Sequence, residues 1–120
     1  MKIGILGATG LIGHHLVLQA TLHQHDVVIL HRKSSNLDVF ASQSIESRIA
    51  DLNDRKSLID AFSGLDAVIN AAAYYPTLPR PTSEELKTSR LLMQFFLDAI
   101  RLSGISKGLY VGAAIAIRDG

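Results

Sequence analysis

The hydrophobic and polar positions of this chain form two alternating patterns. Short runs of consecutive apolar residues are typical of strands covered on both faces of a sheet. They predict strands at residues 2–6, 26–31, 67–71 and 109–111, and we place a further strand, at an edge of the sheet, at residues 45–50. Between them, apolar positions at helical spacing predict helices at residues 10 to about 24, 54–62 and 83–103. Five strands alternating with helices indicate an α/β fold, a Rossmann-type doubly wound parallel sheet in a single domain over residues 1–120.

The ends of two predicted helices carry capping signals. Asp54 and Ser83 are the expected N-caps, because short polar side chains accept hydrogen bonds from the first free N–H groups of a helix. Gly64 and Gly104 lie just past the C-terminal ends, where glycine is favoured. Residues 34–44 are only weakly patterned, and the three prolines among residues 74–82 predict a loop.

The segment between the first strand and the first helix is rich in glycine. Gly7, Gly10 and Gly13 follow the spacing G-x-x-G-x-x-G, one residue longer in its first half than the general dinucleotide motif. Side chains at these positions would keep phosphate groups away from the backbone N–H groups, and the helix must pack closely on its strand. The order of strand, glycine turn and helix start therefore predicts a site for the pyrophosphate of a dinucleotide.

Composition excludes several other classes of function. Twelve basic against eleven acidic residues give a net charge of +1, which offers no reason to expect a nucleic acid or a membrane as partner. The absence of cysteine excludes disulfides and thiol catalysis, and the five histidines lack a recognised metal-ligand spacing, so no metal site is expected. We find neither a signal peptide nor a membrane span, and expect a cytoplasmic protein.

Five motifs along the chain together resemble one family, the extended short-chain dehydrogenase/reductases (the NAD-dependent epimerase/dehydratase family), and within it the dihydroflavonol reductase-like branch. The motifs are Gly7-Ala8-Thr9-Gly10-Leu11-Ile12-Gly13, His31-Arg32-Lys33, Asp51-Leu52, Asn70-Ala71-Ala72-Ala73, and Leu97-Asp98-Ala99-Ile100-Arg101 before Gly104-Ile105. The resemblance implies that backbone around Thr9 to Ile12 holds the pyrophosphate. It further implies that Asp51 and Leu52 flank the adenine and that Ala71, Ala72 and Ala73 lie beside the nicotinamide ribose.

The end of the second strand bears on the choice between NADP and NAD. A carboxylate there would accept hydrogen bonds from the ribose hydroxyls and repel a 2′-phosphate, whereas cations attract that phosphate. This chain has Arg32 and Lys33 at this position, which favours NADP over NAD. The alternative is that both cations are a solvated pair on an exposed loop.

The chain departs from the family in its catalytic residues. The family uses a Tyr-x-x-x-Lys pair for proton exchange, with a Ser or Thr just after the fifth strand. None of the three tyrosines here has a lysine four residues later, and Ala113 or Ala114 occupies the serine position. Ser89 stands where the family often has asparagine. We therefore expect no catalytic residue in this chain, and cofactor binding rather than catalysis.

Three interpretations remain open at this stage. The first is the N-terminal, NAD(P)-binding part of a reductase or epimerase that exchanges hydride with a small-molecule carbonyl or alcohol carbon in a full-length relative. The second is a non-catalytic NADP-binding sensor or regulator, and the third a truncated reading frame. We also expect a homo-oligomer through residues 91–99 or 109–111, although packing on the chain's own sheet explains the apolar surface of the last helix equally well.

Overall fold

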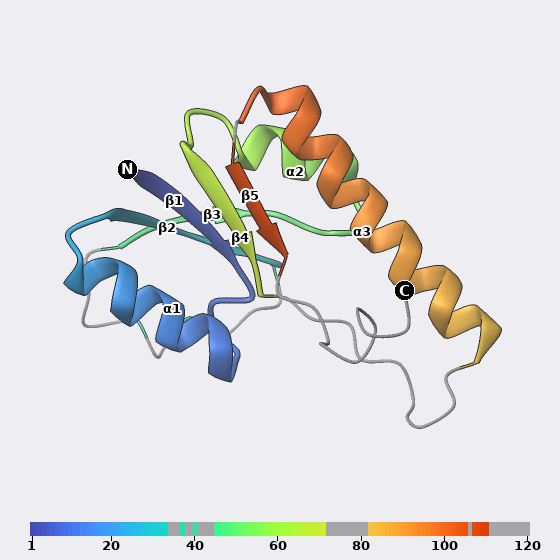
Figure 1. Cartoon of the computed structure of the whole chain (residues 1–120), viewed down its shortest axis with the longest axis horizontal. Helices are drawn as coiled ribbons and strands as arrows, with labels where there is room; N and C mark the ends of the chain where they lie inside the picture. The colour runs from blue at the N-terminus through green and yellow to red at the C-terminus, as the bar shows by residue number, and fades with distance from the viewer. Residues whose placement is uncertain (34–36, 38–39, 41–44, 72–81, 106, 111–120) are drawn as a thin grey trace.

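The computed structural model describes residues 1–33, 37, 40, 45–71, 82–105 and 107–110. The elements in these parts are β1 (Lys2–Leu6), α1 (Leu11–Leu22), β2 (Asp26–His31), β3 (Glu46–Ile49), α2 (Arg55–Ala61), β4 (Ala67–Asn70), α3 (Ser83–Ser103) and β5 (Lys107–Tyr110). The strands form one parallel sheet in the order β3-β2-β1-β4-β5 (Figure 1). The predicted α/β fold with a Rossmann-like parallel sheet is thus confirmed.

Helices cover both faces of this sheet, with α1 on one face and α2 and α3 on the other (Figure 1). Successive strand residues point to opposite faces, so in β2 Val27 and Ile29 join the core under α1, while Val28 and Leu30 join the core under α2 and α3. All four are buried. The uninterrupted apolar run of this strand follows from its having a helical layer on each side.

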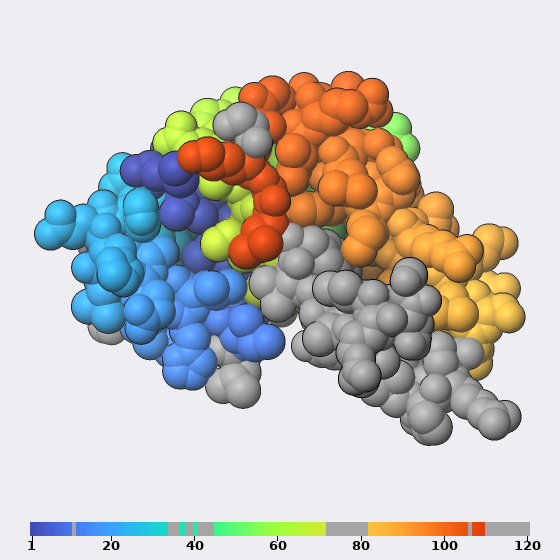
Figure 2. All heavy atoms as spheres, viewed as in Figure 1, coloured from blue at the N-terminus to red at the C-terminus, as the bar shows by residue number. Residues whose placement is uncertain are grey.

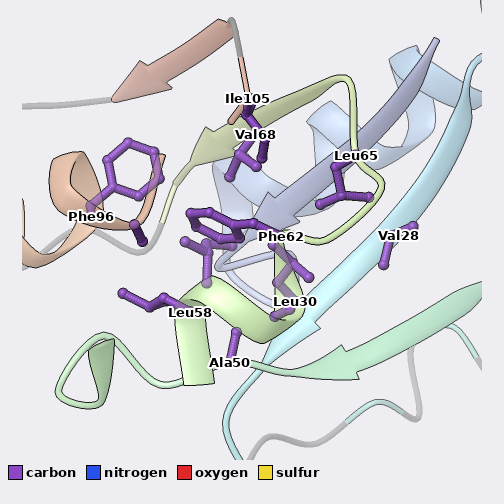
Figure 3. Close-up of a cluster of buried hydrophobic side chains, with 12 residues drawn as sticks. Val28, Leu30, Ala50, Leu58, Phe62, Leu65, Val68, Phe96 and Ile105 are labelled. Carbon is purple, nitrogen blue, oxygen red and sulfur yellow. The ribbon is translucent and has the colours of Figure 1, made fainter. Parts of the chain in front are cut away.

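The larger core lies between the sheet and the pair α2 and α3 (Figure 3). Phe62, at the end of α2, meets Phe96 of α3 edge to face, with ring centroids 6.0 Å apart and an interplanar angle of 80°. Such T-shaped aromatic pairs are favourable because the positive edge of one ring meets the negative face of the other. Val68 of β4 lies beside them and is fully buried.

The smaller core, under α1, includes a residue that the hydrophobic pattern did not reveal. Phe40 lies in the weakly patterned segment between β2 and β3, yet it is only 4% exposed. Its ring lies 5.6 Å from that of His14 on α1. The partial burial of His14 is therefore explained by its packing against Phe40. Separately, the described residues contain no group of three or more His, Cys, Asp or Glu side chains that could hold a metal.

The predicted N-cap of α2 is confirmed, whereas that of α3 was wrong by one residue. Asp54 Oδ1 accepts a hydrogen bond from Ser57 N–H at 3.3 Å. For α3 the cap is Thr82, and Ser83 is the first helical residue. Thr82 Oγ1 accepts from Glu85 N–H at 3.1 Å, and Glu85 Oε1 accepts from Thr82 N–H at 3.0 Å. Only with Thr82 as N-cap does a glutamate fall at the third helical position, which completes this reciprocal capping box.

Two other predicted boundaries shift by about two residues. Helix α1 ends at Leu22, because Gln24 adopts a positive φ of 64° that a helix cannot continue through. Strand β5 begins at Lys107 rather than Leu109, since the polar Lys107 and the side-chain-free Gly108 give no apolar signal. Val111, the predicted end of this strand, lies outside the described residues.

The described residues cover strand β5 on one face only. A Cβ built on Gly108 would lie 2.2 Å from Ile100 Cδ1 of α3, so this face packs tightly against the helix. The next residue, Leu109, points to the opposite face, where it is 56% exposed. Figure 2 accordingly shows β5 (red) at the surface between α1 (blue) and α3 (orange).

Candidate dinucleotide-binding site

The predicted site residues that the structure describes all follow the ends of strands at one common edge of the sheet. Leu6 pairs in register with Leu30 and with Asn70, and His31 pairs with Ile49. Because the strands are parallel, the segments that begin at Gly7, Arg32, Ala50 and Ala71 all start at the carboxyl edge of the sheet. The connections also change sides here, since α1 lies on one face and α2 on the other, and ligands of open α/β sheets bind at such a switch point.

Two features of the glycine turn require glycine, one a backbone conformation and the other a close contact. Gly7 has a φ of 77°, a left-handed conformation that favours glycine, and its carbonyl accepts a hydrogen bond from Gly10 N–H at 3.1 Å. A Cβ on Gly13 would lie 1.9 Å from Gly7 O, 2.6 Å from Gly7 C and 2.8 Å from Ala8 Cα. All three atoms are backbone, so the start of α1 is in direct contact with the turn.

The first turn of α1 presents an uncapped, positively polarised end. Gly10 is the N-cap, and no described side chain bonds the free N–H groups of this helix end. Thr9, Gly10 and Ile12 are exposed, whereas Gly13 is buried against the turn. An anion can therefore approach the amides from the Thr9–Gly10 side, where the helix dipole attracts it. Pyrophosphate binding by Gly7, Thr9, Gly10, Leu11, Ile12 and Gly13 stays a prediction.

Two cations follow the end of β2, as predicted. Arg32 and Lys33 are both exposed, and His31 before them is half-buried. His31 Nδ1 donates to Arg32 O at 2.8 Å, which requires the imidazole proton on Nδ1. His31 O accepts a hydrogen bond from Ala50 N–H at 2.7 Å. The segment that carries the two cations is thus tied to the segment that carries Asp51.

Asp51 and Leu52 form a tight turn between β3 and α2. Asp51 Oδ1 accepts from Asn53 N–H at 2.9 Å, and Asp51 O accepts from Asp54 N–H at 2.9 Å. Short polar side chains favour such turns because they bond their own backbone two residues on. Both Asp51 and Leu52 are half-buried. The carboxylate is therefore held in one orientation and remains accessible from the carboxyl edge.

The fourth segment of the site follows β4. Ala71 is half-buried, and its N–H donates to Leu6 O at 2.9 Å, which ties the end of β4 to the end of β1. Asn70, just before it, is a polar side chain only 1% exposed. Ala72 and Ala73, the other two residues predicted here, lie outside the described residues. Ser89, the residue at the family's asparagine position, is partly buried on α3.

Ser57 is a site-supporting residue that sequence reasoning missed. Its hydroxyl accepts a hydrogen bond from Asp51 N–H at 3.0 Å and lies 3.5 Å from Ile49 O. A serine in the first turn of a helix is common for local reasons, so the sequence alone gave no sign of this contact.

Comparisons with known proteins identify the class. A family described as NAD(P)H-binding matches residues 7–119, and the chain belongs to this family. The bifunctional pinoresinol-lariciresinol reductase of Linum album is 27% identical over 112 residues, which are 86% of this chain and 32% of that protein. The isoflavone reductase homolog of Lupinus albus is 33% identical over 76 residues, 57% of this chain and 24% of that protein.

Solved structures give the same assignment. A nucleoside-diphosphate-sugar epimerase from Pseudomonas aeruginosa superimposes with a TM-score of 0.81 at 34% identity, over 97% of this chain and 34% of that one. The Citrobacter sp. triphenylmethane reductase complexed with NADP(H) has a TM-score of 0.73 at 25% identity, over 96% and 38%. The chain is thus an NAD(P)H-binding Rossmann domain of the reductase/epimerase type, and it spans about a third of the length of these relatives.

Two further observations come from the structure itself. Along the described residues, no helix is both long and apolar enough to cross a membrane. The residues around the carboxyl edge fit a dinucleotide, since Gly13 leaves no room for a side chain between helix and turn and the α1 amides are open to an anion.

Proposed function

We propose that this chain holds NADP(H) as the nucleotide-binding part of an extended short-chain reductase or epimerase of the dihydroflavonol reductase-like branch. The observation that carries the proposal is the contact of Gly13 with the backbone of Gly7 and Ala8, 1.9 to 2.8 Å from a built Cβ. This contact brings the uncapped amides of α1 to the carboxyl edge between β1 and β4, where a pyrophosphate would be stabilised.

We assign the remaining parts of the cofactor to the other three segments of the site. In this proposal Arg32 and Lys33 bind the 2′-phosphate, because a guanidinium can contact a phosphate through two N–H groups. Asp51 and Leu52 receive the adenine, and Ala71, Ala72 and Ala73 lie beside the nicotinamide ribose. The preference for NADP over NAD is supported by the two exposed cations and by the relative that was solved with NADP(H).

Bound NADP(H) would supply a hydride that is exchanged with a carbonyl or alcohol carbon. This chain would bind and orient the cofactor, while its sequence contains no Tyr-x-x-x-Lys pair for moving the proton. We therefore propose that the chain by itself gives no turnover. The small-molecule substrate of a full-length relative would be a nucleotide-sugar or a flavonoid-like ketone, in keeping with the names of the isoflavone reductase homolog and the nucleoside-diphosphate-sugar epimerase that the chain resembles.

Titration with NADPH, followed by its fluorescence, tests the site. Gly10→Asp places a carboxylate next to the pyrophosphate position and should weaken binding by more than about 100-fold, since it replaces an attraction by a repulsion in the same place. Gln19→Glu adds the same charge on an exposed position of α1 away from the turn and should bind as the wild type does. Equal affinity of the wild type and Gly10→Asp would refute the site assignment.

We further propose that the chain self-associates. Leu91, Met93 and Leu97 of α3 are exposed, as is Leu109 of β5. Exposed apolar positions on one helix and at one sheet edge are a common basis of association. Leu92 and Phe95, by contrast, are partly buried, and Phe96 and Ala99 are fully buried within the chain's own core, so only part of the predicted surface is available.

A further inference from the structure

Ser57 connects the end of β3 to the turn that carries Asp51. Its hydroxyl oxygen accepts from Asp51 N–H at 3.0 Å, and its own proton can be donated to Ile49 O at 3.5 Å. A hydroxyl is the smallest side-chain group that can donate and accept at once. The partly buried side chain therefore bridges the residues on either side of Ala50, which is itself bonded to His31 O.

The cap of α2 does not require this hydroxyl. The Ser57 N–H is bonded by Asp54 Oδ1 at 3.3 Å, which satisfies the helix end. The side chain of Ser57 instead points back to the strand end and holds the peptide before Asp51. Its contact thus acts on the turn in addition to any effect on the helix.

The turn leaves one acceptor and one donor without a partner among the described residues. Asp51 Oδ1 is taken by Asn53, while Asp51 Oδ2 and Leu52 N–H make no hydrogen bond there. The Watson–Crick edge of adenine carries the complementary pair, an N6 amino donor beside the N1 acceptor. Recognition by two adjacent hydrogen bonds depends on both groups being held within about 0.5 Å of their productive positions.

We propose that Ser57 is a positioning residue that sets the selectivity of the site for adenine. Through its bond to Asp51 N–H, it fixes the Ala50–Asp51 peptide and so the position of Asp51, from which the carboxylate and the following Leu52 N–H are directed. This inference rests on the proposed binding of NADP(H), and it adds a residue that does not itself contact the cofactor.

The test compares NADPH with its hypoxanthine analogue, in which an oxygen replaces the N6 amino group. The analogue presents an acceptor to the Asp51 carboxylate and an N1–H donor to Leu52 N–H, so the wild type should prefer NADPH by about 10- to 100-fold. Ser57→Ala should lower this ratio about 3- to 10-fold, the worth of one intramolecular hydrogen bond. Ser103→Ala removes a hydroxyl that donates to Ile100 O on α3 and should leave the ratio unchanged.

A second pair of variants separates the hydroxyl from side-chain volume. Ser57→Thr keeps the hydroxyl and Ser57→Val has nearly the same shape without it, so the first should keep the ratio within about twofold of the wild type and the second should lose it. A purely structural role would weaken both ligands equally and leave every ratio as in the wild type, which would overturn the proposal.

The failure of the proposed function would look different. If the wild type bound neither ligand, NADP(H) binding itself would be refuted. If the wild type bound both with equal affinity, the assignment of adenine to Asp51 and Leu52 would be wrong, and the role of Ser57 with it. If the wild type discriminates and Ser57→Val discriminates equally well, cofactor binding stands and the positioning role is refuted.

Discussion

Replacing Gly13 by alanine tests the contact on which the glycine turn depends. In the interior of a helix this change normally stabilises a protein by about 0.5–1 kcal/mol, because alanine has the higher helix propensity. Here the new Cβ would lie 1.9 Å from Gly7 O and 2.6 Å from Gly7 C. These are backbone atoms, so the clash can be relieved only by moving α1 away from the end of β1.

The cost can be estimated from similar overpacking. Forcing an extra carbon into a close-packed site costs about 1–3 kcal/mol, and more where backbone must shift. We therefore expect Gly13→Ala to lower the free energy of unfolding by about 2–4 kcal/mol, a sizeable part of the stability of a small domain. For a chain of this length each kcal/mol corresponds to about 4 °C, so the melting temperature should fall by about 8–16 °C.

Gly10→Ala is the matched control in the same turn. The nearest atom to a Cβ at this position is Gly7 O at 3.4 Å, an ordinary contact, so the melting temperature should change by less than about 4 °C. Thermal unfolding followed by circular dichroism measures both variants. The reasoning fails if Gly13→Ala melts at or above the temperature of the wild type, or if both variants lose the same stability.

Three further outcomes are expected. Arg32→Asp should weaken NADPH far more than NADH, because a lost charge-assisted contact is worth about 1.5–3 kcal/mol; an unchanged ratio of the two affinities would show that Arg32 is only a solvated cation. The hydrogen bond from Arg48, with Lys2 nearby, lowers the pKa of Glu46 below its ordinary value of 4.5. The stability that this carboxylate contributes is complete above pH 4.5 and is lost as the pH falls through the lowered pKa, so Glu46→Gln should lower the melting temperature at pH 7, and this difference should shrink as the pH falls through the lowered pKa. Leu97→Lys should shift the light-scattering mass towards the monomer, since Leu97 is 50% exposed on α3; a wild type that is monomeric at high concentration would contradict self-association.

The glycine turn could be predicted because its requirements are local. A positive φ at Gly7 and a close approach at Gly13 both restrict the residue type directly, and both positions lie within seven residues of sequence. The sheet could be predicted for a related reason, since Val27 to Leu30 are buried on both faces and must all be apolar. Such patterns arise because the immediate surroundings of each residue restrict which residue types can occupy its position.

Contacts between segments that are far apart in the chain give no such pattern in the sequence. Arg48 Nη1 donates to Ala61 O at 2.9 Å and to Ser63 O at 2.7 Å, so a cation on the edge strand β3 binds the last carbonyl of α2 and another just past the helix end. Phe40 is buried by packing on α1 although its neighbours in sequence show no pattern. A polar or isolated aromatic residue is compatible with many environments, and only the folded chain selects one of them.

The same distinction applies within the candidate site. The cations after β2 and the carboxylate after β3 were assigned from separate motifs, but Ala50 N–H donates to His31 O at 2.7 Å, one residue from Arg32 on one side and from Asp51 on the other. A shift of β3 would therefore move the proposed 2′-phosphate and adenine contacts together. Because Arg48 holds α2 to this strand and Ser57 holds the Asp51 turn to its end, the proposed binding mode implies that cofactor selectivity depends on how β3 is seated as well as on the charge at residue 32.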